Sequence, residues 1–292
     1  MNEFKPGRME THPASTVKQK SLIIITMIFF LLYLYNFFRA ILMQEIGLPA
    51  LPGGVLSKLI PPLLFGLFYF WYMRGGRTAV FLLVFLWVYC WAAEELSIHT
   101  GFPFGNYYYS DALGPKVDVV PVMLGLNYFW LLVLPAFFVS NLLVNGEFTS
   151  QGTGWCRLLF TSFVASILIS GMDMVVDPLD ATKMKEWVWT NNAYTGYYGI
   201  PYLNYLGYII VMTPAFFILG LVSRQFRSKP IGPIPGWFAA VILLFYFLNF
   251  IMYGLPAPGG VFIVGFFTMV FPMILAGYRL ILSYPKDYAD QK

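Results

Sequence analysis

The sequence predicts an all-α integral membrane protein, a polytopic bundle of about eight transmembrane helices. Of its 292 residues, 59% are hydrophobic and 11% are charged, whereas about 25% of residues are charged in soluble domains. The mean hydropathy is +0.68. Apolar runs of about 20 residues recur along the chain, each long enough to cross roughly 30 Å of hydrocarbon as a helix. Runs this long and this uniformly apolar predict helices and exclude the alternating strands of a membrane barrel.

The apolar runs divide the chain in order. They lie at residues 21–44, 58–74, 78–97, 121–144, 157–176, 203–222, 236–254 and 260–283. The second run is short and only GLPAPG separates the last two, so seven spans is the alternative. We expect 1–20 to be a disordered basic tail, 284–292 a second tail, and 21–283 a single transmembrane domain with its catalytic core at about 78–222.

Basic residues lie mainly in the loops on one side of the expected membrane. If the N-terminus is cytoplasmic, most of the 18 Lys and Arg residues fall on the inner side. The positive-inside rule therefore predicts that both termini are cytoplasmic in a multi-pass protein of the cell membrane. These charges flank lipid-spanning runs, so the expected partner is the bilayer and no nucleic acid is expected.

One long polar passage, EELSIHTGFPFGNYYYSDALGPK at 94–116, interrupts this apolar chain. It begins with two carboxylates, of which at most one can face the bundle interior, because adjacent helical residues point about 100° apart. A Gly- and Pro-rich turn follows, of the kind that lets backbone approach a ligand closely. Two later polar passages, 171–189 and 196–207, fall on the same predicted outer face. We expect all three to close over one pocket near the extracytoplasmic surface.

The fifth span carries the second pair of acids. Asp173 and Asp177 are four residues apart in MDMVVDP, so they share a helical face. Pro178 predicts the end of the regular helix, and Pro135 predicts a kink in the fourth span. Carboxylates at membrane depth are costly unless paired or solvated, which makes this pair a functional candidate.

The candidate residues are four acids and a set of aromatic and amide side chains. The catalytic candidates are Glu94, Asp111, Asp173 and Asp177; the substrate-binding candidates are Phe104, Tyr107, Tyr109, Asn127, Trp187, Trp189, Tyr198 and Asn204. The sequence has no Ser-His-Asp set, phosphate loop, HExxH motif or Cys/His cluster, so we expect neither cofactor nor metal. The remaining chemistry is acid/base work by carboxyl groups, because burial lets one keep its proton while another is ionised.

Ordinary structural roles compete with these assignments. Single Tyr and Trp residues near a membrane surface usually belong to an interfacial belt. His99 has no second His nearby, so capping or hydrogen bonding is its expected role, and Glu95, Asp118 and Asp180 are expected to be solvated charges.

The polar passages resemble the membrane carotenoid hydratase family. The resemblance covers about residues 90–210 and lies in TGFPFGNYYYSDALGP, MDMVVDP, WVW and GYYGIPYLNYLGY. It implies addition of water to the terminal ψ-end double bond of a carotenoid, which gives a tertiary alcohol without a redox cofactor. In such a site, Asp173 or Glu94 would donate the proton and Asp177 would position the water.

Two other functions stay open at this stage. Asp173 and Asp177 could form one aspartate-rich motif of a magnesium-dependent polytopic prenyltransferase, although no second motif is present. The chain could also be a non-enzymatic carotenoid-binding membrane protein, which would need the pocket but would not need the acids.

Overall fold

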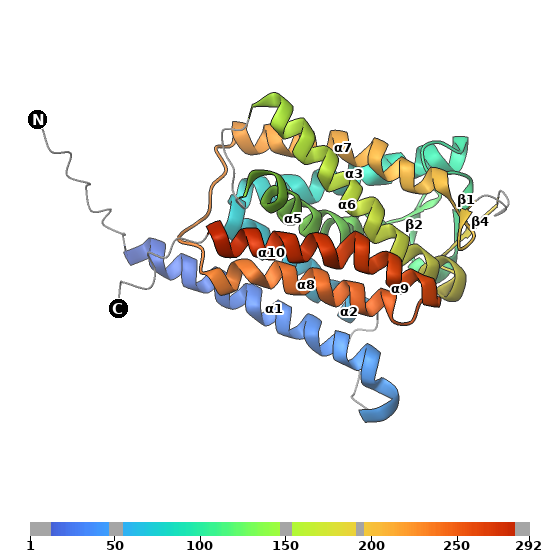
Figure 1. Ribbon diagram of the computed structural model, residues 1–292, viewed down its shortest axis with the longest axis horizontal. Helices are drawn as coiled ribbons and strands as arrows, with labels where there is room; N and C mark the ends of the chain where they lie inside the picture. Colours follow the sequence, from blue (N-terminus) through green and yellow to red (C-terminus); the bar gives the residue numbers. More distant parts are fainter. Residues whose placement is uncertain (1–12, 47–54, 147–153, 191–195, 284–292) are drawn as a thin grey trace, which may run out of the picture.

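The computed structural model describes residues 13–46, 55–146, 154–190 and 196–283, which form a bundle of long helices (Figure 1). Within this part of the chain, 8 helices are long and apolar enough to cross a membrane, which confirms the predicted eight. The last two stay separate, because the turn at 255–258 divides them. The alternative of seven spans is therefore wrong for the described residues.

In the described part of the chain, ten α-helices are accompanied by three π-helical turns. Their bounds are α1 (Pro13–Ile46), α2 (Val55–Arg74), α3 (Gly76–Thr100), α4 (Leu124–Asn127), α5 (Leu134–Asn145), α6 (Trp155–Leu179), α7 (Tyr202–Gln225), α8 (Gly236–Gly254), α9 (Gly259–Gly265) and α10 (Phe271–Ser283). π-helical turns at Tyr128–Val133 and Phe266–Val270 join α4 to α5 and α9 to α10, and a third at Asp180–Met184 extends α6.

Prolines explain two of these irregularities. Pro135 is the second residue of α5, directly after the first π-helical turn. It has no N–H to donate to the preceding turn, so the span changes its winding there. α6 ends at Leu179, one residue after Pro178, as predicted.

The N-terminal helix begins earlier than predicted. Residues 1–12 lie outside the described part, but α1 starts at Pro13, so the expectation that residues 13–20 are a disordered tail was wrong. Proline suits the first turn of a helix because its missing N–H would have no partner there. The second expected tail, 284–292, also lies outside the described residues.

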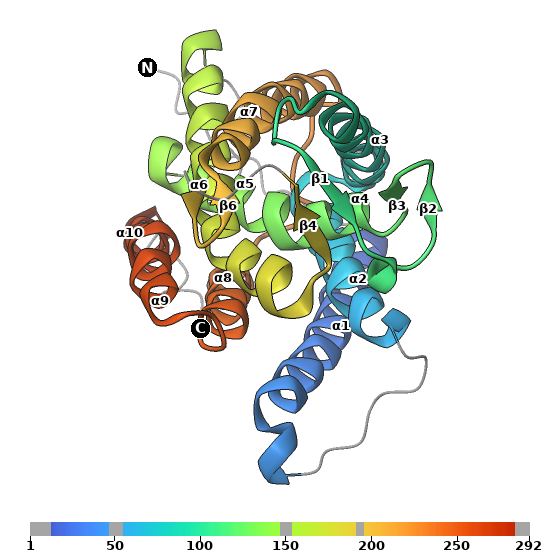
Figure 2. The ribbon, with the colours of Figure 1, turned by 90° about the vertical axis from the view of Figure 1, so that its right-hand side faces the viewer.

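Among the described residues, three two-stranded antiparallel sheets, not predicted from the sequence, lie at one end of the bundle, which we call the strand end (Figure 2). Their strands are β1 (Tyr107–Tyr109) with β4 (Trp187–Trp189), β2 (Lys116–Val117) with β3 (Val120–Pro121), and β5 (Gly196–Tyr197) with β6 (Ile200–Pro201). These strands are too short for an alternating pattern to stand out in the sequence. The β1–β4 sheet lies across the end of the bundle, between α3, α6 and α7.

Aromatic packing holds the centre of the bundle together. The rings of Phe30 and Phe65 lie 5.1 Å apart, and Phe245 of α8 is 4.9 Å from Phe65. The Tyr33 hydroxyl donates a hydrogen bond to Asn249 Oδ1 at 2.8 Å. These contacts tie α8 to α1 and α2, so helices far apart in the sequence pack directly against one another.

Candidate active site

A tight turn brings the first polar passage back over the end of α3. The helix ends at Thr100 and is capped by Gly101, whose φ of 77° is in the left-handed region that glycine adopts readily. Ser97, buried in the last turns of the helix, accepts a hydrogen bond from the Phe104 N–H at 3.0 Å and donates one to the Gly105 carbonyl at 3.1 Å. The chain therefore reverses, and β1 runs over the side chain of Glu94.

Glu94 is enclosed by tyrosine hydroxyls. Its side chain lies in the interior, with 3% of the residue exposed. Tyr107 and Tyr109 both donate to Oε2, the second at 2.9 Å, and Tyr128 donates to Oε1. Burial, and then the charge of Glu94, hold the pKa values of Tyr107 and Tyr109 well above their usual range. The two strand tyrosines therefore remain neutral hydrogen-bond donors.

The two aspartates of α6 share a single amide. Asp173 and Asp177 lie on one face of the helix, as the sequence predicts, and are 2% and 3% exposed. Asn204, in the first turn of α7, donates from Nδ2 to Asp173 Oδ2 at 2.7 Å and to Asp177 Oδ2 at 2.9 Å. An amide nitrogen carries two hydrogens, so it can serve both carboxyl groups at once.

Two further tyrosines connect the acids into one network. The hydroxyls of Tyr128 and Tyr208 are 3.0 Å apart, and the Tyr208 hydroxyl interacts with the carboxyl group of Asp173. The order of contacts is therefore Glu94, Tyr128, Tyr208 and Asp173. The sequence argument did not select Tyr128 or Tyr208. Helical spacing could have found Tyr208, because it lies four residues after Asn204 and so shares its face.

The aromatic cover beside Glu94 comes from the pairing of β1 with β4. Tyr107 lies opposite Trp189 and Tyr109 opposite Trp187, with ring centroids 4.8 Å and 6.3 Å apart. Successive strand residues point to opposite faces, so Tyr108 between them is exposed. Tyr107, Tyr109, Trp187 and Trp189, all chosen from the sequence, are thus brought together beside Glu94.

The remaining predicted residues lie differently. Phe104 is buried and packs on the ring of Tyr208, 5.1 Å away. Asp111 does not join the other acids, because its fully exposed side chain pairs with Lys116 Nζ at 3.1 Å in a surface turn. Asn127 accepts a hydrogen bond from Trp130 Nε1, and exposed Tyr198 packs on Tyr197. No contact places Asp111, Asn127 or Tyr198 against the network in the described part of the chain.

Comparison with known proteins assigns the chain to a family. A family model described as "Carotenoid biosynthesis protein" matches residues 53–275, which is most of the chain. The chain belongs to the carotenoid biosynthesis protein family. Bisanhydrobacterioruberin hydratase of Haloarcula japonica is 31% identical to this family member over 150 residues, 51% of this chain and 46% of the relative. The match thus spans about half the length of that relative. No solved structure matches this carotenoid biosynthesis protein.

Close backbone packing in this carotenoid biosynthesis protein fixes the position of α7 against the turn. A Cβ added at Gly207 would lie 2.6 Å from the Pro103 carbonyl oxygen and 2.7 Å from the Phe104 ring. We expect Gly207→Ala to lower the free energy of unfolding by about 1–3 kcal/mol, because the backbone must shift to admit the methyl group. Thermal unfolding of the purified protein checks this, with Gly259→Ala as a matched control, since its added methyl meets nothing within 4 Å. Equal unfolding temperatures for the two variants would contradict the argument.

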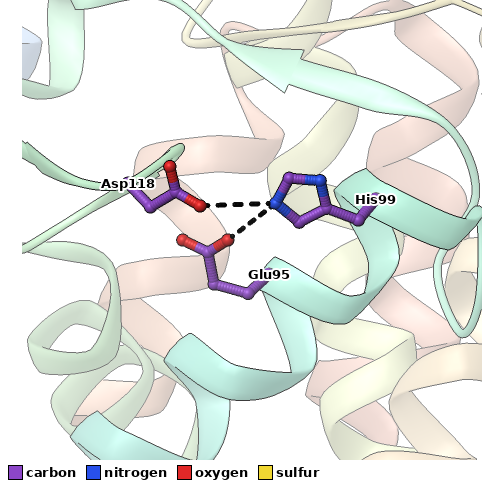
Figure 3. Close-up of side chains that lie close together, drawn as sticks. All are labelled: Glu95, His99 and Asp118. Atoms are coloured by element: carbon purple, nitrogen blue, oxygen red, sulfur yellow. Dashed lines mark hydrogen bonds and ion pairs between the residues drawn. The ribbon is translucent and has the colours of Figure 1, made fainter.

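A second group of polar side chains lies on the outer face of α3 (Figure 3). His99 Nε2 is 3.3 Å from Glu95 Oε2 and 3.4 Å from Asp118 Oδ2, and the three ligand atoms lie within 4.8 Å of one another. Four ligands about 2.1 Å from a divalent cation would lie about 3.4 Å apart, so these residues could hold one. The same contacts are also those of an ion pair between His99 and the two carboxylates, with no cation bound.

This outer group corrects one expectation. Glu95 is not a solvated charge: it is 9% exposed, because the β2–β3 turn covers it and the Val119 N–H donates to its Oε1 at 3.2 Å. Glu94 and Glu95 do face different sides of α3, as their adjacent positions predict.

An apolar groove on the carotenoid biosynthesis protein lies apart from the acids. It has a volume of about 1100 Å³ and follows one face of α3 from Gly76 to Ala92. Residues two apart on a helix point about 200° apart, so the groove at Ala92 faces away from Glu94. Glu94 itself is covered by the aromatic rings of β1 and β4.

Proposed function

We propose that this carotenoid biosynthesis protein adds water across the terminal ψ-end double bond of an acyclic or half-cyclised carotenoid, forming a tertiary alcohol without a redox cofactor. The observation that carries the proposal is the buried polar network, in which Glu94 holds three hydroxyl donors while Asp173 and Asp177 share one amide. The relative named as a hydratase supports the same class of reaction. The distribution of basic residues supports placing the reaction near the extracytoplasmic face.

The aspartate pair is the proton donor in this proposal. Among the described residues, no Lys or Arg forms an ion pair with Asp173 or Asp177. Two buried carboxylates repel each other when both are ionised, so such a pair holds a shared proton. That proton is transferred to the less substituted carbon of the terminal alkene, and the positive charge develops on the tertiary carbon.

Glu94 is the base. Its three hydroxyl donors offset part of the cost of burying a carboxylate, and in this proposal the ionised form of Glu94 stabilises the nearby carbocation. The faces of Tyr107 and Trp189 add cation–π stabilisation. Water forms the new C–O bond at the tertiary carbon and gives one proton to Glu94.

The tyrosine contacts complete the cycle. A proton on Glu94 returns to the aspartate pair through the hydroxyls of Tyr128 and Tyr208, which link the two acid groups. One water is consumed, no electron is transferred, and the enzyme regains its starting protonation.

Expression in a host that makes an acyclic carotenoid tests the proposal. We expect a new pigment heavier by one water, with heavy oxygen incorporated when membranes react in heavy-oxygen water. Oxygen taken from O₂ would contradict hydration, and an unchanged pigment profile despite bound carotenoid would favour a binding protein.

A chelator separates hydration from prenyl transfer. We expect EDTA to leave product formation unchanged, because the proposed step uses only carboxyl and hydroxyl groups. Loss of product that Mg²⁺ restores would favour the prenyltransferase, in which Asp173 and Asp177 hold a metal–diphosphate.

A further inference from the structure

A buried arginine at the end of the bundle opposite the strand end has no hydrogen-bond acceptor. Arg74, the last residue of α2, is 5% exposed. Its guanidinium lies over the ring of Phe137, 5.4 Å from the centroid, and among the described residues it makes no hydrogen bond or ion pair, with Nε fully enclosed. A guanidinium has five N–H donors and stays charged, so burying it without an acceptor is costly. We therefore expect an anion to bind beside Arg74.

Arg74 borders a small cavity between α5, α6 and α7. The cavity has a volume of about 40 Å³, and its charged lining residues are Arg74 and Arg224. One water needs about 10–15 Å³, so the space suits about three waters or one small polyatomic ion. No acid lines it in the described part of the chain, so the cavity supplies no counter-charge for Arg74.

Two other unpartnered polar atoms indicate what kind of ion fits. Ser223 Oγ and Asn145 Oδ1 both border the cavity, are buried, and have no partner among the described residues. Ser223 can donate, whereas Asn145 Oδ1 can only accept. A halide would satisfy the donors alone. A protonated oxyanion such as hydrogen phosphate has oxygens for Arg74 and Ser223 and an O–H for Asn145.

We propose that this cavity binds a phosphate-type oxyanion, with Arg74 as its principal ligand. The guanidinium fork matches two oxygens of such an anion. The site is separate from the carboxyl network and does not depend on the hydration proposed above. Inorganic phosphate and the phosphate of a lipid headgroup share the required chemistry.

Equilibrium dialysis of the purified full-length protein against labelled inorganic phosphate tests the site. We expect about one phosphate per chain, an unfolding temperature that rises with the logarithm of phosphate concentration at constant ionic strength, and loss of both in Arg74→Met. Arg77→Gln, an exposed arginine at the same end, is the matched control and keeps both. Ser223→Ala retains the charge and weakens binding, which keeps the test informative if Arg74→Met does not fold.

Two further measurements decide which group is the anionic partner of Arg74. Stabilisation by phosphatidylglycerol in micelles, lost in Arg74→Met, would support the site with a lipid phosphate as its ligand. The proposal fails if neither phosphate source binds the wild-type protein. It also fails if phosphate binds only after Glu147→Gln, because a carboxylate of the chain would then be the partner of Arg74.

Discussion

Replacing Asp177 with Asn is expected to lower the rate of carotenoid hydration by about 10²–10⁴-fold, the usual contribution of a positioned general acid. The side chains have nearly the same shape, so the contact with Asn204 Nδ2 can be kept through the amide oxygen. What is lost is the second carboxyl group, and with it the proton that the pair shares. The rate is measured as hydrated pigment formed per amount of protein in isolated membranes.

The same variant should fold at least as well as the wild-type protein. Neutral replacements of buried charged groups are often neutral or stabilising, because they remove a desolvation cost. An unchanged or higher unfolding temperature together with lost activity would therefore identify a chemical role for Asp177. Asp118→Asn, at an exposed acid in the turn between β2 and β3, controls for the substitution itself and is expected to keep full activity. Near-normal product from both Asp173→Asn and Asp177→Asn would exclude the pair as the proton donor.

Helical spacing was enough to predict half of this site. The four-residue interval between Asp173 and Asp177 places them on one face, and adjacency places Glu94 and Glu95 on different faces, because the α-helix has a fixed angle per residue. The eight spans follow from the length of hydrocarbon a helix must cross. These features depend only on the local geometry of the helix, so they can be predicted from a single sequence.

Contacts between distant segments could not be predicted in the same way. The pairing of Tyr107 with Trp189, and of Tyr128 with Tyr208, joins segments about 80 residues apart, and nothing local sets their register. Asp111 shows the opposite case. It lies within the most polar passage, yet the turn after β1 directs it to solvent and to Lys116, which its sequence position does not reveal.

Glu94→Gln is expected to lower activity to a similar extent as Asp177→Asn, but with a loss of stability that Asp177→Asn does not show. The carboxylate accepts from Tyr107 and Tyr109 on one oxygen and from Tyr128 on the other. Gln offers one oxygen and an NH₂ group that only donates, so at least one of these hydroxyls can no longer donate to the side chain and loses its hydrogen bond to the carboxylate. Loss of a hydrogen bond to a charged group costs about 1.5–3 kcal/mol, which thermal unfolding detects.

A second substitution separates the two effects of losing Glu94. If Tyr128 donates to Glu94, Tyr128→Phe should cost less stability in the Glu94→Gln background than in the wild-type protein, because the hydrogen bond from Tyr128 to the carboxylate is already lost there. Activity should not return in the double variant, since the base and the hydroxyl that returns its proton are both missing. Glu95→Gln changes the adjacent carboxyl group on the other side of α3 and should keep activity. Full activity in Glu94→Gln, or activity restored to that variant by Tyr128→Phe, would contradict the proposal that Glu94 is the base. Glu94 would then only hold the tyrosines in place.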